Sequence, residues 1–307
     1  MEGTLTKTIL SKKWLLIVII MLLAIIVGSF TVATFFDLEI SKALYGMDSG
    51  FGKFFAYFFE VVGFLPALLI NVFLFILLFN HFKKIWIRII FAVLTFSTLM
   101  ACGFVAFNPL VENEIMQQNF LLIPGAIIAI VVGIPALIYS KRINVETRNK
   151  LIYITIIAAI VGTLTCGTVA IVQFSWGRAR FFSLDDTFAG YTPWYIKDLG
   201  SSALKLRSFP SLHSASSFST VSLILLAWVL NTKKLCKISL IVTAITILVC
   251  VPLSRVVKGY HYATDVLAST IIGIIFLFAA IPFVDWLYNR KRNKTAQTQD
   301  QDQSIAS

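Results

Sequence analysis

Long apolar runs constrain the fold of this chain more than any other feature of its sequence. Eight of them approach the length that a helix needs to cross a bilayer, which is about 20 residues. They cover residues 14–36, 61–80, 85–107, 119–140, 151–174, 212–230, 238–257 and 262–287. Only 13% of the residues are charged, whereas soluble domains carry about 25%. The sequence therefore predicts an all-α, polytopic membrane helix bundle of about eight transmembrane helices.

The distribution of charge predicts how the chain crosses the membrane. With the N-terminus in the cytoplasm, 17 of the 26 lysines and arginines fall at cytoplasmic boundaries. These boundaries are residues 7–13, 83–88, 141–150, 233–237 and 290–294. An excess of basic residues in cytoplasmic loops is typical of multi-pass membrane proteins. We therefore expect both termini to lie in the cytoplasm. We expect the protein to reside in the plasma membrane. The net charge of +11 then needs no nucleic-acid partner.

The runs and the segments between them suggest three regions. Residues 1–150 form an N-terminal transmembrane region of about four spans, and residues 151–292 form a transmembrane core that holds the chemically distinctive residues. Residues 293–307 are a polar tail that we expect to be disordered. The aromatic stretch FGKFFAYFFE, within residues 37–60, predicts an interfacial helix on the outer side. Residues 175–211 form the longest loop, also on the outer side, and loops of that length usually carry function.

Three outer segments collect the residues that can carry chemistry. They read QFSWGRARFF from 173, RSFPSLHS from 207 and LSRVVKGYHYATD from 253. Two of the three histidines of the chain, His213 and His261, belong to them. A single arginine here could be an anchor at the membrane interface, and a single histidine could be a polar residue of a channel wall. Together the residues favour a catalytic site.

These residue types suit phosphoryl transfer. Arginine matches phosphate oxygens bidentately, and the transition state needs charge neutralisation more than covalent help. One histidine can attack phosphorus while another protonates the leaving oxygen. His261 and Asp265 are four residues apart, so the carboxylate can accept a hydrogen bond from one ring nitrogen and leave the other free. Pro210 and Ser211 suit a helix start, where free N–H groups attract phosphate.

The motifs resemble those of the type 2 phosphatidic acid phosphatase superfamily, which includes lipid phosphate phosphatases and vanadium haloperoxidases. The family pattern is K-x6-R-P, then P-S-G-H, then S-R-x5-H-x3-D. The third motif is complete. The residues at the positions of the first motif are Gln173, Arg180 and Phe181, those of the second are Pro210, Ser211, Leu212 and His213, and those of the third are Ser254, Arg255, His261 and Asp265. The resemblance covers about residues 151–287, and the first four predicted spans carry no motif.

The resemblance implies roles for these residues. His261 would be the nucleophile, His213 the general acid and Asp265 its relay. The phosphate would be held by Arg180, Arg255, Ser211 and the amide of Leu212. The implied activity is hydrolysis of a lipid phosphate or pyrophosphate through a phosphohistidine, at the outer side of the membrane. We expect no cofactor and no metal, because the motifs offer no carboxylate cluster suited to Mg²⁺.

Three departures from the family pattern bear on phosphate binding. Gln173 replaces a lysine, Leu212 replaces a glycine and Phe181 replaces a proline. The glutamine can still donate a hydrogen bond to phosphate, but a charge-assisted bond is roughly twice as strong. Other basic residues could restore the missing charge, and the candidates are Arg178, Lys205, Arg207 and Lys258.

Two other functions stay open at this point. A phosphotransferase would use the same histidine and pass the phosphoryl group to an alcohol. A catalytically weakened membrane scaffold would keep the helices without turnover, and the changes at Gln173 and Leu212 are its support. The lipid also stays open among phosphatidate, phosphatidylglycerol phosphate, a polyprenyl pyrophosphate and a sphingoid phosphate, as does the oligomeric state.

Overall fold

The computed structural model describes residues 13–58, 72, 83–112, 142–197, 207–229 and 233–306, with some positions between 123 and 138. Every regular element within these residues is helical, which confirms the all-α class. The elements are α2 (Lys13–Leu44), α3 (Gly50–Phe58), α5 (Ile85–Glu112), α7 (Val145–Trp176), the 3-10 turn η3 (Phe181–Ser183), α8 (Leu212–Phe218), α9 (Val221–Val229), α10 (Lys234–Val257) and α11 (Ala263–Ala306).

Four of the described helices are long and apolar enough to cross a membrane. They cover Ile17–Leu44, Val145–Ser183, Lys234–Val257 and Ala263–Arg290, and two shorter apolar helices cover Ile85–Ser97 and Leu212–Trp228. The chain is therefore a multi-pass integral membrane protein. The predicted spans 61–80 and 119–140 lie mostly outside the described residues. The count of eight spans and the cytoplasmic termini stay predictions.

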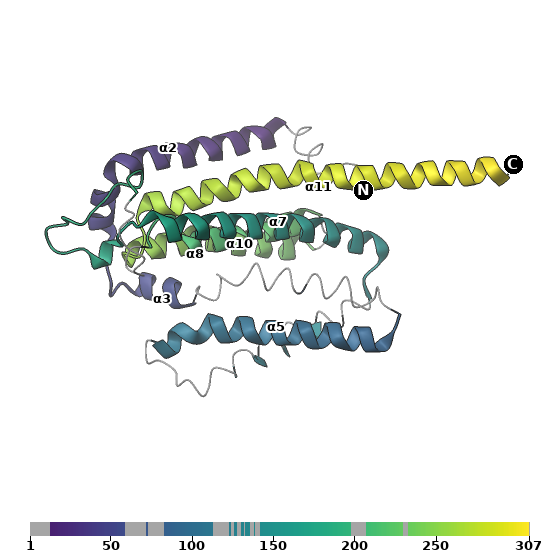
Figure 1. Ribbon diagram of the computed structural model, residues 1–307, viewed down its shortest axis with the longest axis horizontal. Coiled ribbons are helices and arrows are strands. Elements are labelled where there is room, and N and C mark those ends of the chain that lie inside the picture. Colours follow the sequence, from purple (N-terminus) through teal and green to yellow (C-terminus); the bar gives the residue numbers. More distant parts are fainter. Residues whose placement is uncertain are drawn as a thin grey trace.

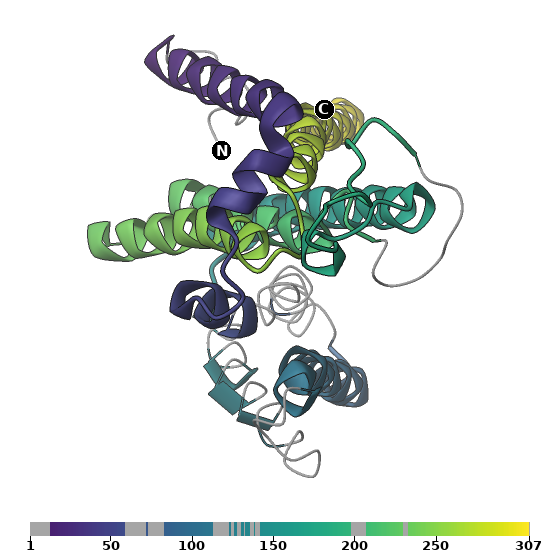
Figure 2. The same ribbon diagram turned by 90° about the vertical axis from the view of Figure 1, so that its left-hand side faces the viewer.

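The long helices lie side by side in one bundle (Figures 1 and 2). α11 packs against α7, α2 and α8, while α10 packs against α9, α3 and α8. At the left end of the bundle in Figure 1, the loop after α7, the C-terminal part of α2 and the start of α11 gather together. All three predicted motif segments meet at this end.

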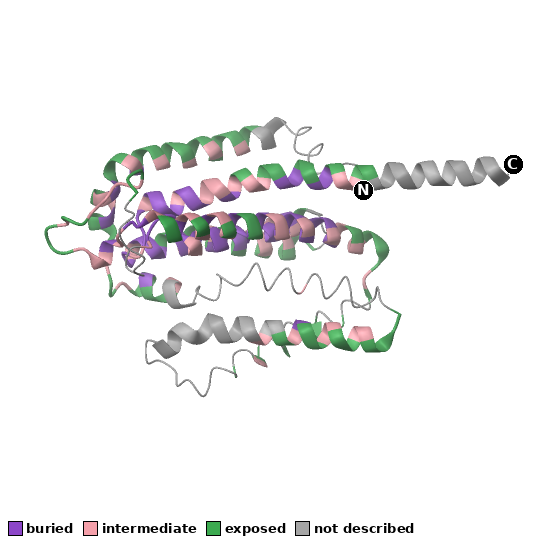
Figure 3. Cartoon of the chain, in the orientation of Figure 1, coloured by how far each residue is buried: buried purple, intermediate pink, exposed green. Residues whose placement is uncertain are grey.

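Burial gives α7, α10 and residues 263–290 of α11 an inner and an outer face (Figure 3). The core contains Tyr153, Ile154 and Ile157 of α7, packed with Ile281 and Val284 of α11. Large apolar side chains point outward along the bundle, as in the exposed Ile17, Met21 and Ile25 of α2. An apolar outer face is what contact with lipid requires.

Helix ends differ from the sequence prediction in three places. α2 runs to Leu44 through a kink at Phe36, whereas the apolar run ends at 36. The sixth run is divided into α8 and α9, where the hydroxyl of Thr220 donates to the carbonyl of Ser217 (2.7 Å) and competes with regular helix geometry. α11 continues to Ala306 through the tail that we expected to be disordered, because alanine, glutamine and lysine favour helix. The predicted interfacial helix corresponds to α3.

We predict that Gly273 is required for the contact between α8 and α11. A Cβ added there would lie 2.4 Å from the ring of Phe218, so Gly273→Ala should destabilise the protein by about 1–3 kcal/mol through overpacking. The measurement is thermal unfolding of the purified protein in detergent. Gly28→Ala is the control, because nothing lies within 4 Å of a Cβ there. Recovery of stability in Gly273→Ala/Phe218→Leu would locate the clash, and an unfolding temperature unchanged by Gly273→Ala would contradict it.

Candidate active site

The loop that follows α7 is directed into the bundle by a glycine turn. α7 follows an Asn144 cap and ends at Trp176. The next residue, Gly177, has a φ of 84° in the left-handed region, which glycine adopts without steric cost. Arg178 follows and is fully buried. Its carbonyl accepts a hydrogen bond from the amide of Ser208 (3.0 Å). The two ends of the long loop are therefore joined next to each other.

A second glycine turn brings the third motif to the same place. Gly259, between α10 and α11, has a φ of 67°, and a Cβ there would lie 2.8 Å from the ring of Tyr45. The amide of Phe182 donates to the carbonyl of Gly259 (3.1 Å). This bond joins the loop that carries Arg180 to the turn that carries His261.

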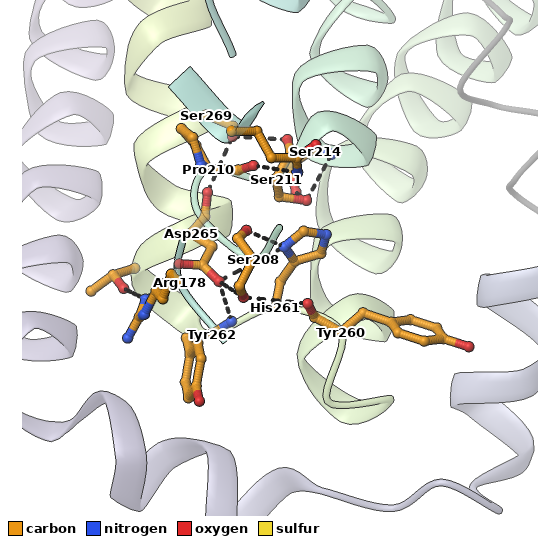
Figure 4. A network of polar contacts seen from close by, with 12 residues as sticks. Arg178, Ser208, Pro210, Ser211, Ser214, Tyr260, His261, Tyr262, Asp265 and Ser269 are labelled. Carbon is orange, nitrogen blue, oxygen red and sulfur yellow. Dashed lines mark hydrogen bonds and ion pairs between the residues drawn. The ribbon is translucent and has the colours of Figure 1, made fainter. Parts of the chain in front are cut away.

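His261 is held in one tautomer by a backbone carbonyl. Its side chain is buried, and Nδ1 lies 2.6 Å from the carbonyl oxygen of Ser208 (Figure 4). A carbonyl can only accept, so the hydrogen-bond network assigns the proton to Nδ1. In the neutral ring Nε2 then carries the lone pair, as a nucleophile requires.

Asp265 supports this arrangement indirectly. The sequence predicts that its carboxylate accepts from the ring of His261, but His261 Nδ1 and Asp265 Oδ2 are 3.7 Å apart. Oδ2 instead accepts from the hydroxyl of Ser208 (2.5 Å) and from the amide of Tyr262 (2.7 Å). Asp265 therefore holds Ser208 in position, and the carbonyl of Ser208 holds the ring of His261. The carboxylate of Asp265 also places a negative charge beside that ring.

The guanidinium of Arg178, a candidate for phosphate binding from the sequence, binds groups of the protein. Its Nη1 donates to Asp265 Oδ1 (2.5 Å) and its Nη2 to Asp37 Oδ2 (2.8 Å). Its Nε donates to the carbonyl of Thr192 (2.9 Å). The guanidinium is 0% exposed and lies between two carboxylates, so its charge is balanced inside the protein. Its contacts connect α2, the loop after α7 and the start of α11, and its predicted role in phosphate binding stays a prediction.

Arg180 and Arg255 form the cationic part of the site. Their guanidinium carbons lie 5.7 and 5.8 Å from the ring centroid of Tyr260, and the charge of Arg255 acts on Arg180. The Nε atom of Arg180 is buried and has no hydrogen-bond partner among the described residues. The half-buried His213, at the start of α8, lies within the electrostatic influence of Arg180, Arg255 and His261. The structure therefore brings the predicted histidines and arginines together.

The loop before α8 is braced from several sides. Ser211 is the N-cap of α8, and its hydroxyl oxygen accepts from the amide (3.3 Å) and the hydroxyl (3.0 Å) of Ser214. Leu212 is the first residue of α8 and is half-buried. Gln173 Nε2 donates to the carbonyl of Pro210 (2.7 Å). The glutamine at the lysine position of the family pattern therefore positions this loop and adds no charge to the site.

The other candidate basic residues have different environments. Lys258 is buried, and its Nζ donates to the carbonyl of Met47 (2.7 Å). Arg207 is half-buried over the ring of Phe174, 4.3 Å from its centroid, and its charge acts on Arg180. Lys205 lies outside the described residues. Arg207 therefore acts on Arg180 and Lys258 on Arg255, but the amine of Lys258 is already bound to the carbonyl of Met47.

Two important residues of the site were not singled out from the sequence. Asp37 was only an outer acidic residue after the first apolar run, and Ser208 was one of many loop serines. Asp37 follows the kink of α2 and is 1% exposed. A carboxylate at the end of an apolar run was the one signal that could have found it, because buried carboxylates within spans are costly and usually functional.

The fold and the site together define a multi-pass helical membrane protein with a buried site of histidines and arginines. Residues 149–289 match the family model of the PAP2 superfamily, which supports the superfamily that the motifs predicted. The family supports a phosphatase, and thus a phosphoester hydrolase. Searches of curated proteins and of solved structures found no match.

We predict an acidic limit of activity that lies below the ordinary titration range of histidine. Burial lowers the pKa of His261 from its usual 6.5, Asp265 opposes this shift and Arg180 adds to it. A lowered pKa keeps Nε2 unprotonated as the pH falls through 6.5, and only the neutral ring can attack. The measurement is kcat/KM for phosphate release as a function of pH.

The substrate itself titrates in the same range, so it needs a control. Two substrates whose phosphate groups have different pKa values should show the same acidic limb if His261 sets it. A limb at or above pH 6.5, unchanged between the two substrates, would contradict the prediction.

Proposed function

We propose that this protein is an integral-membrane lipid phosphate or pyrophosphate phosphatase that acts through a phosphohistidine on His261. One observation carries the proposal. The guanidinium carbons of Arg180 and Arg255 lie 5.7 and 5.8 Å from the ring centroid of Tyr260, the neighbour of His261 in the chain, while Arg178 is already neutralised. Like charges held together at a largely buried site are unfavourable unless an anion joins them. A phosphoryl group has the charge and the acceptor oxygens for this place.

In the first step, Nε2 of His261 attacks the phosphorus. The bond from phosphorus to the lipid oxygen breaks, and its electron pair stays on that oxygen. The bound phosphoryl anion offsets the charges of Arg180 and Arg255 and stabilises the protonated form of His213. His213 then donates its proton to the leaving oxygen, so the dephosphorylated lipid leaves as an alcohol, or as a monophosphate if the substrate is a pyrophosphate. Arg180 and Arg255 neutralise the charge on the equatorial oxygens during transfer.

In the second step, water resolves the intermediate. Its oxygen attacks the phosphorus, the bond to Nε2 breaks, and the electron pair returns to His261. His213, neutral after the first step, accepts the proton of the water and is ready for another cycle. Inorganic phosphate leaves the site. The arginines supply the positive charge throughout, so the proposal needs neither a metal nor a cofactor.

The membrane setting suits a lipid substrate. The site lies at one end of the bundle (Figure 1), where a headgroup would be, and exposed apolar side chains run along the helices. The distribution of lysine and arginine in the sequence favours the outer side for this end. An acyl or polyprenyl anchor in the bilayer would then present its phosphate to His261.

The test is phosphate release by the purified protein in detergent with EDTA present. Phosphatidate, phosphatidylglycerol phosphate, a polyprenyl pyrophosphate and a sphingoid phosphate form the panel. We expect release from at least one lipid, and a loss of at least about 10³-fold in His261→Ala, because the nucleophile is removed. His81→Ala is the matched control, since that histidine belongs to none of the three motif segments.

The alternatives give different results in the same assay. Transfer of phosphate to an added alcohol without release into water would indicate a phosphotransferase. No turnover with any lipid, with or without an acceptor, would contradict the proposal and favour a scaffold. Activity that EDTA abolishes would contradict the metal-independent mechanism.

We further predict that Arg207 replaces the charge missing at Gln173. A charge-assisted hydrogen bond contributes about 1.5–3 kcal/mol, so Arg207→Gln should lower kcat/KM by about 10- to 100-fold, mainly through KM. Lys197→Gln, an exposed charge of the same loop region, is the control. Unchanged kinetics in Arg207→Gln would rule out this role.

A further inference from the structure

A buried carboxylate from the N-terminal region reaches the candidate active site. Asp37 belongs to α2, outside the residues 149–289 that match the family model. Both of its oxygens are bound: Oδ1 accepts from the amide of Thr264 (3.0 Å), and Oδ2 accepts from Arg178 Nη2 (2.8 Å) and from the hydroxyl of Thr264. Thr264 lies in the first turn of α11. Asp37 thus caps the helix that carries Asp265, although it comes from a different helix.

Continuous contacts connect Asp37 to the nucleophile. Asp37 binds Arg178, and Arg178 Nη1 donates to Asp265 Oδ1 (2.5 Å). Asp265 Oδ2 accepts from the hydroxyl of Ser208 (2.5 Å), and the carbonyl of Ser208 lies 2.6 Å from His261 Nδ1. Each contact in this series joins buried groups, so movement at one end cannot easily be absorbed by solvent or by loose packing.

The charges of this network make Asp37 more than a packing residue. A single guanidinium is shared by two carboxylates, all of them at most 1% exposed. Buried ions are costly unless their partners are well placed, so Arg178 takes the one position that serves both acids. Asp37 therefore determines where Arg178 meets Asp265, and it adds a negative charge behind the site.

A second attachment holds the same region of the chain against the turn that carries His261. The amide of Gly46 donates to the carbonyl of Val257 (2.9 Å), and Lys258 Nζ donates to the carbonyl of Met47 (2.7 Å). The N-terminal region is thus docked on the third motif at two places, independently of the Asp37 contacts.

We propose that Asp37 and Arg178 form a positioning pair that sets the geometry and the electrostatic environment of His261 through Asp265. The proposal rests on the proposed function for its kinetic consequence, but the environment of the imidazole can be measured without turnover. The N-terminal region would then contribute to the reaction a residue that the motifs of the superfamily do not include.

The direct test is titration of His261 by nitrogen-15 NMR of histidine-labelled protein in detergent. The chain has only three histidines, and His261→Gln assigns the signal. The charged or titratable groups around His261 are Asp265 of α11, Arg180 of the loop after α7, Arg255 of α10 and His213 of α8. Asp37→Asn removes a negative charge behind Asp265 while nearly preserving shape. The titration midpoint should therefore move to lower pH by several tenths of a pH unit or more.

Kinetics on the same variants test the geometric part. In Asp37→Asn we expect kcat to fall by about 10- to 100-fold, because small displacements of a reacting group are that costly, while KM changes little. Arg178→Lys keeps the charge but cannot reach all four acceptor groups, which are Asp37, Asp265, the carbonyl of Thr192 and the hydroxyl of Thr264. It should retain the midpoint of the wild-type titration and lose kcat. Asp48→Asn is the matched control, since that carboxylate of the N-terminal region is 94% exposed.

The outcomes separate this proposal from the proposed function. A folded Asp37→Asn protein, judged by size exclusion and thermal unfolding, whose His261 titrates like wild type would overturn the positioning role, whatever happens to turnover. If Asp37→Asn does not fold, wild-type kcat in a folded Arg178→Lys protein would overturn it. Wild-type protein that releases no phosphate contradicts the phosphatase alone, and a shifted midpoint in Asp37→Asn still supports the pair.

Discussion

The guanidinium of Arg178 is the group on which the geometry of the site depends. It joins α2, the loop after α7 and the start of α11 through contacts with Asp37, Thr192 and Asp265. Breaking a buried ion pair usually costs about 3–5 kcal/mol, because a charge is left without its partner. The three segments are therefore held in one arrangement, and Ser208 and His261 take their positions from Asp265.

The arginines of the site have two different tasks. Arg178 is neutralised within the protein, while Arg180 and Arg255 lie together beside the ring of Tyr260, next to the histidines. This division explains how a mostly apolar bundle can hold ions. Arg178 stabilises the fold locally, and under the proposed function Arg180 and Arg255 bind a phosphoryl group, whose oxygens can accept several charge-assisted bonds.

The sequence was sufficient to predict the helical class. It also predicted that His213, His261, Asp265, Arg180 and Arg255 come together, because the spacing of the apolar runs and the charges at their ends place these residues at the same side of the membrane. It was insufficient for contacts between distant segments. Asp37 and Thr264 are 227 positions apart, and no local pattern links them. Arg178 and Arg180 look equivalent in the sequence, yet the turn at Gly177 buries the first against two carboxylates. The carbonyl of Ser208, rather than Asp265, binds the ring of His261. The sequence could not predict this bond, because every residue has a backbone carbonyl.

The central claim is that Nε2 of His261 forms a covalent bond to phosphorus. The most direct measurement is mass spectrometry of His213→Gln protein, rapidly quenched under alkaline conditions during reaction with p-nitrophenyl phosphate. That substrate has a leaving group that needs no proton, so the first step should remain fast while the second, which uses His213 as a base, becomes slow. The account predicts phosphate on the peptide that contains His261 and none in the His213→Gln/His261→Ala protein. Phosphate on another residue, or turnover with no phosphorylated peptide, would contradict it.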